Sequence, residues 1–168
     1  MRFFDLVVMQ NVPEPLCKRL GYSKIFSAGK DVGILENAAQ DRSKVVIRSD
    51  NLEAIVKGLR QNNVIGLLPK NVTVSRKAIE VVKESEKIVL LPLCEVTKGE
   101  DALRAAQLAK MRKLVRSVLI AKAPFALVSL ADNRENLISS LQMTEVAGFL
   151  GIPRERAKSA MGIIGDLL

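Results

Sequence analysis

Short apolar runs alternate along the chain with segments that repeat at the period of an α-helix. Six runs predict strands, at residues 3–9, 24–28, 44–48, 64–68, 88–96 and 125–130. Most of these runs are continuously apolar, as in parallel strands that are buried on both faces. Strands that alternate with helices are typical of successive βαβ units. The pattern therefore predicts an α/β fold on a parallel sheet and argues against an antiparallel meander.

Helices are predicted between the strands, at residues 16–20, 51–61, 102–121, 136–150 and 154–167, with a further one that begins at Thr73 or Val74. Asp50 and Glu53 form a D-x-x-E start for the helix at 51–61. Gly151 followed by Pro153 separates the last two helices, as a C-cap glycine and a helix-opening proline do. The pattern of residues 29–42 fits either a short helix or a loop.

The length limits the architecture. Six strands are fewer than the eight of a full (β/α)₈ barrel, and 168 residues fall short of that fold's usual ~200 to 250. An abbreviated barrel and an open sheet both fit. Without repeats or linkers, a single domain over residues 1–168 is expected. Asp5 interrupts the apolar start, and no run approaches the ~20 residues of a membrane helix, so a cytoplasmic protein without membrane contact is expected.

The composition excludes several chemistries. The chain has no histidine, so it can form no Ser-His-Asp triad, His-ligated zinc site or imidazole acid/base pair. Cys17 and Cys94 lack the spacing of metal ligands and are expected to be buried and free. The carboxylates near strand ends are Asp5, Glu95 and Asp132. They favour caps or ion pairs, although magnesium binding stays open.

The charge is strongly basic, with 26 Lys and Arg against 18 Asp and Glu, or +8 at pH 7. Residues 102–131 hold six of the cations and no acid: Arg104, Lys110, Arg112, Lys113, Arg116 and Lys122. Arg112, Lys113 and Arg116 share the outer face of the predicted helix, where they repel one another unless a polyanion or an acidic partner neutralises them. Because aromatic residues are few, backbone contacts with structured RNA fit better than base stacking.

Three segments of the sequence resemble one family: RFFDLVVM, SRKAIEVV and VSLADNRENLISSLQMTEVAGFLGIPRERAKSAMGIIGDLL. They are similar to the ribonuclease P protein component 3 family, the thirty-kilodalton proteins of archaeal and eukaryotic ribonuclease P. The likeness is closest from about Ala105 to the C-terminus. It implies a TIM-barrel-like α/β fold of about six to seven strands, related to the PHP phosphoesterases that open with D-L-H-x-H. Here Val7 and Met9 occupy the two histidine positions, so the metal site is lost.

The resemblance implies a subunit of the endoribonuclease that matures the 5′ end of precursor tRNA, with the catalytic centre in the RNA. The implied partners are ribonuclease P RNA, protein component 2, other ribonuclease P proteins and, indirectly, precursor tRNA. No cofactor is expected in this chain, and Mg²⁺ is expected for the RNA. The family commonly exceeds 200 residues, and about one βα unit is missing here between Leu90 and Ala102.

Nine basic residues form the expected RNA-binding set. The resemblance implies a contact for Arg76 or Lys77 in SRKAIE, for Arg134 before NLISS and for Lys158 in RAKSA. The charge argument adds three residues of one helix face, and two strand-end residues complete the set: Arg112, Lys113, Arg116, Arg48 and Lys70.

Two other functions remain open. A small barrel enzyme would bind a phosphorylated metabolite at the carboxyl ends of the strands, through Lys70, Arg48 or residues 131–134. A protein-interaction domain would use its basic helix to dock an acidic partner.

Overall fold

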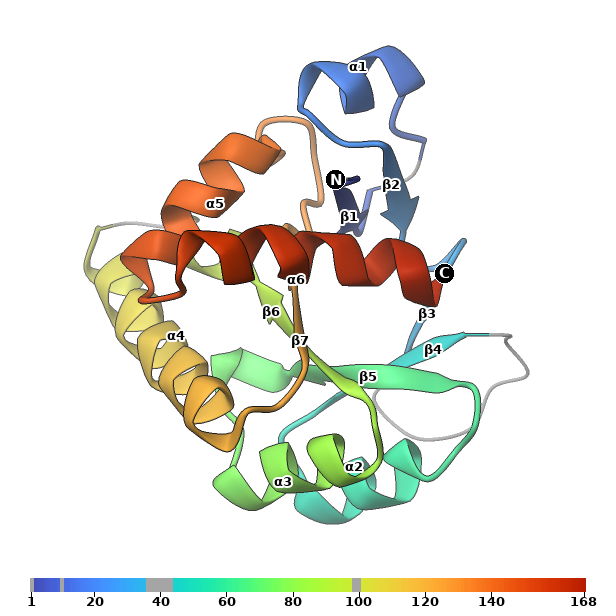
Figure 1. Cartoon of the computed structure of the whole chain (residues 1–168), viewed down its shortest axis with the longest axis vertical. Coiled ribbons are helices and arrows are strands. Elements are labelled where there is room, and N and C mark those ends of the chain that lie inside the picture. Colours follow the sequence, from blue (N-terminus) through green and yellow to red (C-terminus); the bar gives the residue numbers. More distant parts are fainter. Residues whose placement is uncertain (1, 10, 36–43, 98–100) are drawn as a thin grey trace.

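The computed structural model describes residues 2–9, 11–35, 44–97 and 101–168 (Figure 1). Its strands form two parallel sheets. The larger sheet has the order β3 (Gly33–Leu35), β4 (Val45–Ser49), β5 (Val64–Pro69), β6 (Ile88–Pro92), β7 (Phe125–Val128). The smaller sheet pairs β1 (Phe4–Val7) with β2 (Lys24–Ser27). The predicted α/β class with a parallel sheet is confirmed.

The helices follow the strands as the sequence pattern indicates. They are α1 (Glu14–Arg19), α2 (Leu52–Leu59), α3 (Arg76–Glu84), α4 (Asp101–Ala121), α5 (Ser140–Phe149) and α6 (Arg154–Leu167), with 3₁₀ turns η1 (Lys70–Val72) and η2 (Leu93–Val96). In Figure 1, α2 and α3 lie together below the larger sheet and α4 lies at its left. Helix α6 crosses in front and packs against β1 and β7. None of the described helices is long and apolar enough to cross a membrane.

Two apolar clusters lie on opposite faces of the strands. The larger cluster packs alternate strand residues, such as Ile47 and Leu67, against the helices. The smaller cluster combines the other alternate residues from both sheets, including Leu6, Phe26, Val46, Leu68, Leu90 and Val128. Both faces of the strands are thus buried, which is why the sequence shows continuous apolar runs.

Backbone hydrogen bonds bring the small sheet beside the edge strand of the large one. The Leu130 amide donates to the Leu6 carbonyl, and the Val8 amide donates to the Ala131 carbonyl, both at 2.9 Å. A single parallel bridge joins Ala28 to Val32. No continuous ladder joins the two sheets within the described residues, so a closed barrel is not confirmed.

Several boundaries differ from the sequence prediction. Helix α3 begins at Arg76, after the Ser75 cap, instead of at Thr73 or Val74. Strand β3 lies inside the ambiguous segment 29–42, of which 36–42 are outside the described residues. The run at 88–96 is a strand only to Pro92, after which Leu93–Val96 form the 3₁₀ turn η2. Helix α5 begins at Ser140 instead of residue 136, because Ser139 and Gln142 form a capping box there.

Capping residues account for two further helix ends. Asn51, rather than Asp50, caps α2 by accepting the Glu53 and Ala54 amides. Gly151 has φ +91°, which confirms its predicted place between α5 and α6. Cys17 and Cys94 are both buried, and no disulfide joins them, as the sequence predicts.

Candidate nucleic-acid interface

Helix α4 is 21 residues long and has one buried face. Met111, Leu114, Val115 and Val118 pack into the larger apolar cluster. Arg112, Lys113 and Arg116 are exposed on the other side, so the outward orientation predicted for these three cations is confirmed.

The Arg112 guanidinium lies against α5. It donates to the Phe149 carbonyl oxygen at 3.2 Å, and its central carbon lies 4.9 Å from the centre of the Phe149 ring. Phe149 is itself 65% exposed. These contacts orient the guanidinium on the surface while leaving it without a carboxylate partner among the described residues, so its charge stays available to an anion.

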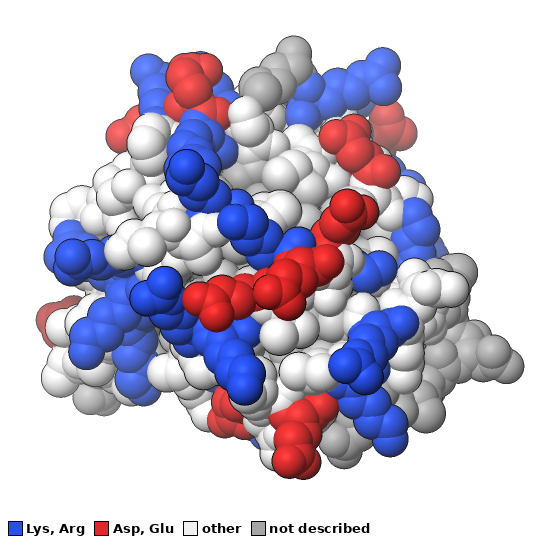
Figure 2. All heavy atoms as spheres, turned by 60° about the horizontal axis from the view of Figure 1, so that its bottom comes forward, with Lys and Arg blue, Asp and Glu red and all other residues white. Residues whose placement is uncertain are grey.

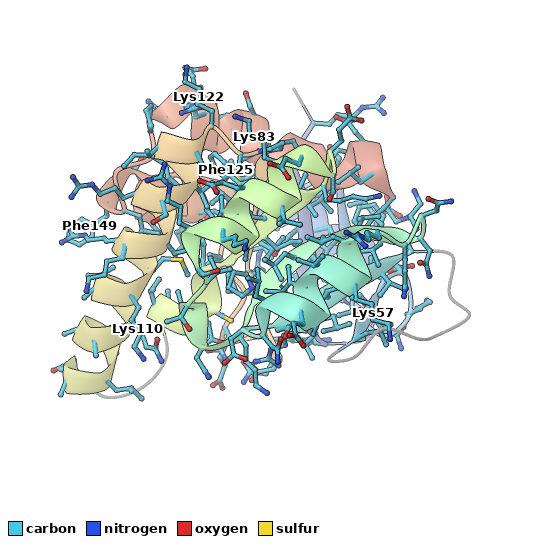
Figure 3. The ribbon with its side chains drawn as sticks, turned by 90° about the horizontal axis from the view of Figure 1, so that it is seen from below. Lys57, Lys83, Lys110, Lys122, Phe125 and Phe149 are labelled. Atoms are coloured by element: carbon cyan, nitrogen blue, oxygen red, sulfur yellow. The ribbon has the colours of Figure 1, made fainter. Side chains whose placement is uncertain are left out.

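Lys113 and Lys110 line a cavity of about 240 Å³ between α4 and the segment that joins η1 to α3. Figure 3 labels Lys110 on α4, and α4 packs against η1 and α3. We call this cavity the α4–η1 notch; its other lining residues are Val72, Thr73, Val74, Leu114 and Ser117. Among the described residues, the lining contains no carboxylate, and neither lysine forms an ion pair.

The backbone on the η1 side of the notch is strained. Asn71 and Val72 both have left-handed dihedral angles, with φ +52° and +59°. Asn adopts this conformation more readily than most residues with a side chain, but for a β-branched residue such as Val72 it is an outlier. The Val72 side chain is 2% exposed and packs into the larger cluster, which holds the turn in place. Strain of this kind persists only where packing fixes it, and it is common at binding sites.

Two predicted residues begin the helix next to the notch. Arg76 and Lys77 are exposed in the first turn of α3, which the Ser75 hydroxyl caps through the Ala78 amide. The Arg76 Nε donates to Glu80 Oε1 at 3.0 Å in an exposed ion pair. Lys70 is the first residue of η1 and is half-buried. The structure therefore brings Lys70, Arg76, Lys77 and Lys113 to one side of the molecule.

The other predicted residues lie elsewhere. Arg48 is exposed at the carboxyl end of β4. Arg134 is exposed after β7 and lines a cavity with α1 residues such as Arg19. Lys158 is half-buried on α6, where its Nζ lies 3.1 Å from Glu155 Oε1. The nine predicted residues thus do not form one continuous patch.

The structure contains a second cationic cavity that the sequence analysis did not predict. It has a volume of about 410 Å³, lies at the amino end of β7, and is lined by Lys122, Arg156 and Glu155 among others. Lys83 of α3 lies near it, because its Nζ donates to the Ala121 carbonyl at 3.1 Å. Figure 3 shows Lys83, Lys122 and Phe125 at the same end of the molecule. These cations come from three distant segments, so no local pattern could have grouped them.

The visible face in Figure 2 is basic but not uniform. A row of acidic side chains crosses its middle, with Lys and Arg on both sides. The left part of this face, where α4 lies in Figure 1, is mostly basic. Basic side chains therefore predominate beside α4, and further Lys and Arg side chains lie on the other side of the acidic row.

The acid of the opening strand makes a structural contact with a distant residue. Asp5 is fully buried, and its carboxylate accepts the Ser129 hydroxyl at 2.5 Å, the Ser129 amide at 2.7 Å and the Leu6 amide at 2.8 Å. Burial raises the pKa of Asp5 to about 6, although these hydrogen bonds favour the ionised form.

Val7 and Met9, which stand where the D-L-H-x-H pattern has histidines, lie in apolar surroundings. Val7 is completely buried in the larger cluster and Met9 packs against it. Glu95 lies in η2, and Asp132 lies in the loop after β7, where its Oδ1 accepts a hydrogen bond from the side-chain Nδ2 of Asn136 at 2.7 Å. The described residues contain no group of three or more potential metal ligands.

The fold resembles solved structures. A chain in the cryo-EM structure of archaeal ribonuclease P with mature tRNA aligns with a TM-score of 0.69 and 9% identity, covering 97% of this chain and 80% of that one. The crystal structure of an uncharacterized protein aligns with a TM-score of 0.55 and 15% identity, covering 74% of this chain and 33% of that one. No protein-family model and no curated protein matches the sequence. At these identities, the comparison establishes a shared fold.

Proposed function

We propose that this chain is a protein subunit of the ribonuclease P ribonucleoprotein, in which it supports the catalytic RNA during 5′ maturation of precursor tRNA. It binds the RNA backbone through basic residues and pairs with protein component 2. The observation that carries the proposal is the agreement between the sequence resemblance and the fold comparison. The sequence resembles the component 3 family, and the fold matches a chain of archaeal ribonuclease P over 97% of this chain.

The charge distribution supports the RNA part of the proposal. Exposed Arg112, Lys113 and Arg116 project from a helix anchored by four buried residues, so the cations are held on a rigid element. Lys and Arg that neutralise phosphates release counterions, which gives affinity without sequence reading. Cations of this kind lower the Mg²⁺ concentration that a folded RNA needs, while the bond cleavage stays with the RNA.

The test is a native co-purification from the source cells, with the tagged full chain. The proposal expects recovery of ribonuclease P RNA and a component 2 protein, together with cleavage of precursor tRNA at its 5′ end by the eluate. Recovery of neither the RNA nor the cleavage activity, from an extract in which another ribonuclease P protein does recover them, would refute the proposal. Turnover of a phosphorylated metabolite by the nucleic-acid-free chain would favour the enzyme instead.

A further inference from the structure

We infer that the α4–η1 notch is a binding site for a phosphodiester group of an RNA backbone, with Lys110 and Lys113 as the cations and Ser117 as a hydrogen-bond donor. The inference rests on the proposed RNA-binding function and assigns one contact of that function to defined atoms. Neither Lys110 nor Ser117 is in the RNA-binding set derived from the sequence.

The two lysines lie three positions apart on α4 and therefore face the same side of the helix. Both line the notch, and no carboxylate among the described residues neutralises either one. Two like charges at this spacing destabilise a helix unless an anion lies between them. A phosphate group that accepts from both ammonium groups removes this repulsion.

The notch contains two hydroxyl groups, and they differ in whether their hydrogen is already engaged. Thr73 Oγ1 already donates to the Lys70 carbonyl at 3.2 Å, so its hydrogen is engaged. Ser117 is half-buried and lines the notch, and its hydroxyl makes no hydrogen bond with any residue that the structure describes. Ser117 can therefore donate to a phosphate oxygen without breaking a contact of the fold.

The size of the notch favours a chain over a small molecule. Pockets that enclose a metabolite usually measure about 300 to 1,000 Å³, and they cover most of the ligand's surface. The notch measures about 240 Å³, enough for a phosphate group whose attached chain passes over the surface.

Cations continue beyond the notch in two directions, with Arg116 on the next turn of α4 and Lys77 in the first turn of α3. A backbone that carries a phosphate at every nucleotide can use this succession, whereas a single phosphomonoester cannot.

The rigidity of the notch comes from the strained turn. Asn71 and Val72 hold left-handed angles, and the buried Val72 side chain fixes the η1 wall against α4. Leu114 anchors the α4 wall, since it is buried in the same apolar cluster. Both walls are therefore set before the ligand arrives, which reduces the entropy lost on binding.

The experiment measures binding of a fluorescein-labelled 24-nucleotide RNA hairpin to the full chain by anisotropy at several salt concentrations. Lys110→Ala with Lys113→Ala removes both cations. Ser117→Leu fills the notch without changing the charge. The matched control is Lys57→Ala with Arg60→Ala, an exposed pair at the same spacing, with Lys57 in the last turn of α2 and Arg60 at its C-cap. Thermal melting of each variant checks that it is folded.

The inference expects the double lysine variant to bind about tenfold more weakly near 0.1 M salt, with a salt slope shallower by about 1.4 to 1.8. Ser117→Leu is expected to weaken binding several-fold at unchanged net charge, and the control pair is expected to change it less than twofold. Equal effects of the notch pair and the control pair would overturn the inference, because only general electrostatics would then be at work. Unchanged binding by Ser117→Leu would also overturn it.

A second arm separates the source of the phosphate. Glycerol 3-phosphate is titrated into ¹⁵N-labelled protein while the amide signals of Thr73 and Ser117 are followed, and the RNA hairpin is titrated in parallel. Saturable shifts with the hairpin alone support the inference, and tight saturable shifts with glycerol 3-phosphate alone overturn it in favour of a metabolite site. If the hairpin binds through the notch but native co-purification recovers no ribonuclease P RNA, the inference that the notch binds an RNA phosphodiester is supported and the proposed function is refuted.

Discussion

Asp5 shows how one buried carboxylate connects distant parts of the chain. Its two oxygens accept three hydrogen bonds, two of them from Ser129, which lies 124 positions away at the end of β7. The contact fixes β1 beside β7, where only a few backbone hydrogen bonds join the two sheets. A residue that resembles the first position of a metal-binding strand thus has a structural role here.

The first prediction compares two substitutions of this residue. Asp5→Asn keeps an oxygen for the Leu6 and Ser129 amides, and its NH₂ can donate to the Ser129 hydroxyl, so the unfolding free energy at pH 7 should not fall. Asp5→Ala leaves two buried amides without an acceptor and should cost about 2 to 4 kcal/mol. Urea unfolding of both variants checks this. A stable Asp5→Ala would show that the contact is dispensable.

The second prediction concerns pH. Because the pKa of Asp5 is raised from 3.8 in the unfolded chain to about 6 in the folded one, the folded state binds the extra proton between these values. This contribution to stability is fully present below pH 3.8 and is lost as pH rises through 6. A shift of two pKa units corresponds to about 3 kcal/mol at most.

Asp5→Asn provides the reference, because it does not titrate at this position. The stability advantage of Asp5→Asn over the natural chain should therefore shrink as pH falls from 7 to 5. Urea unfolding of both proteins at each pH measures the difference. A difference that stays constant over this range would mean that Asp5 keeps an ordinary pKa in the folded protein.

The elements that the sequence predicted well are those with a long apolar stripe. Helix α4 shows four buried residues at helical spacing, and its exposed face follows directly from that spacing. The run at 88–96 was predicted to be a strand throughout, because its pattern does not separate the strand from the turn that follows. Leu93, Cys94 and Val96 are buried in a 3₁₀ turn as completely as strand residues are. Burial alone selects apolar residues, whatever the backbone conformation.

The candidate site was predictable only where its residues share one element. Lys113 follows from the face of α4, and Lys110 lies three positions before it on the same helix. The η1 wall could not be predicted, since nothing in the letters Lys70–Val72 indicates two successive left-handed residues. Strand β3 was missed for a related reason: three residues are too few to show a period.

The third prediction concerns the capping box of α5. The Ser139 hydroxyl accepts the Gln142 amide at 3.2 Å, and Gln142 Oε1 accepts the Ser139 amide at 2.8 Å. Ser139→Ala removes the first of these bonds and should lower the unfolding free energy by about 1 kcal/mol. Ser139→Asp, which can still cap, should restore most of the loss. Equal stability of all three proteins in urea would mean that packing alone places this helix.

At the scale of the whole molecule, the net charge of +8 is spread unevenly. Two exposed cations, Arg76 and Lys18, lie beside carboxylates of their own helices and contribute little field at a distance. Arg112, Lys113 and Arg116 of α4 have no such partner among the described residues, whereas Arg104 of the same helix lies 3.8 Å from Asp101. The side of the molecule that carries α4 should therefore attract a polyanion first.

The fourth prediction tests this asymmetry with two triple variants of equal charge. Arg112→Ala, Lys113→Ala and Arg116→Ala together should weaken hairpin RNA binding and make the salt slope shallower by about 2 to 3, one near-unit step for each lost phosphate contact. Lys30→Ala, Lys57→Ala and Arg60→Ala remove the same charge from exposed positions away from α4 and should change the slope by less than 1. Both variants should remain folded, because none of the six side chains is buried. If the two variants lose affinity and slope equally, RNA responds only to the net charge and the exposed face of α4 has no special role.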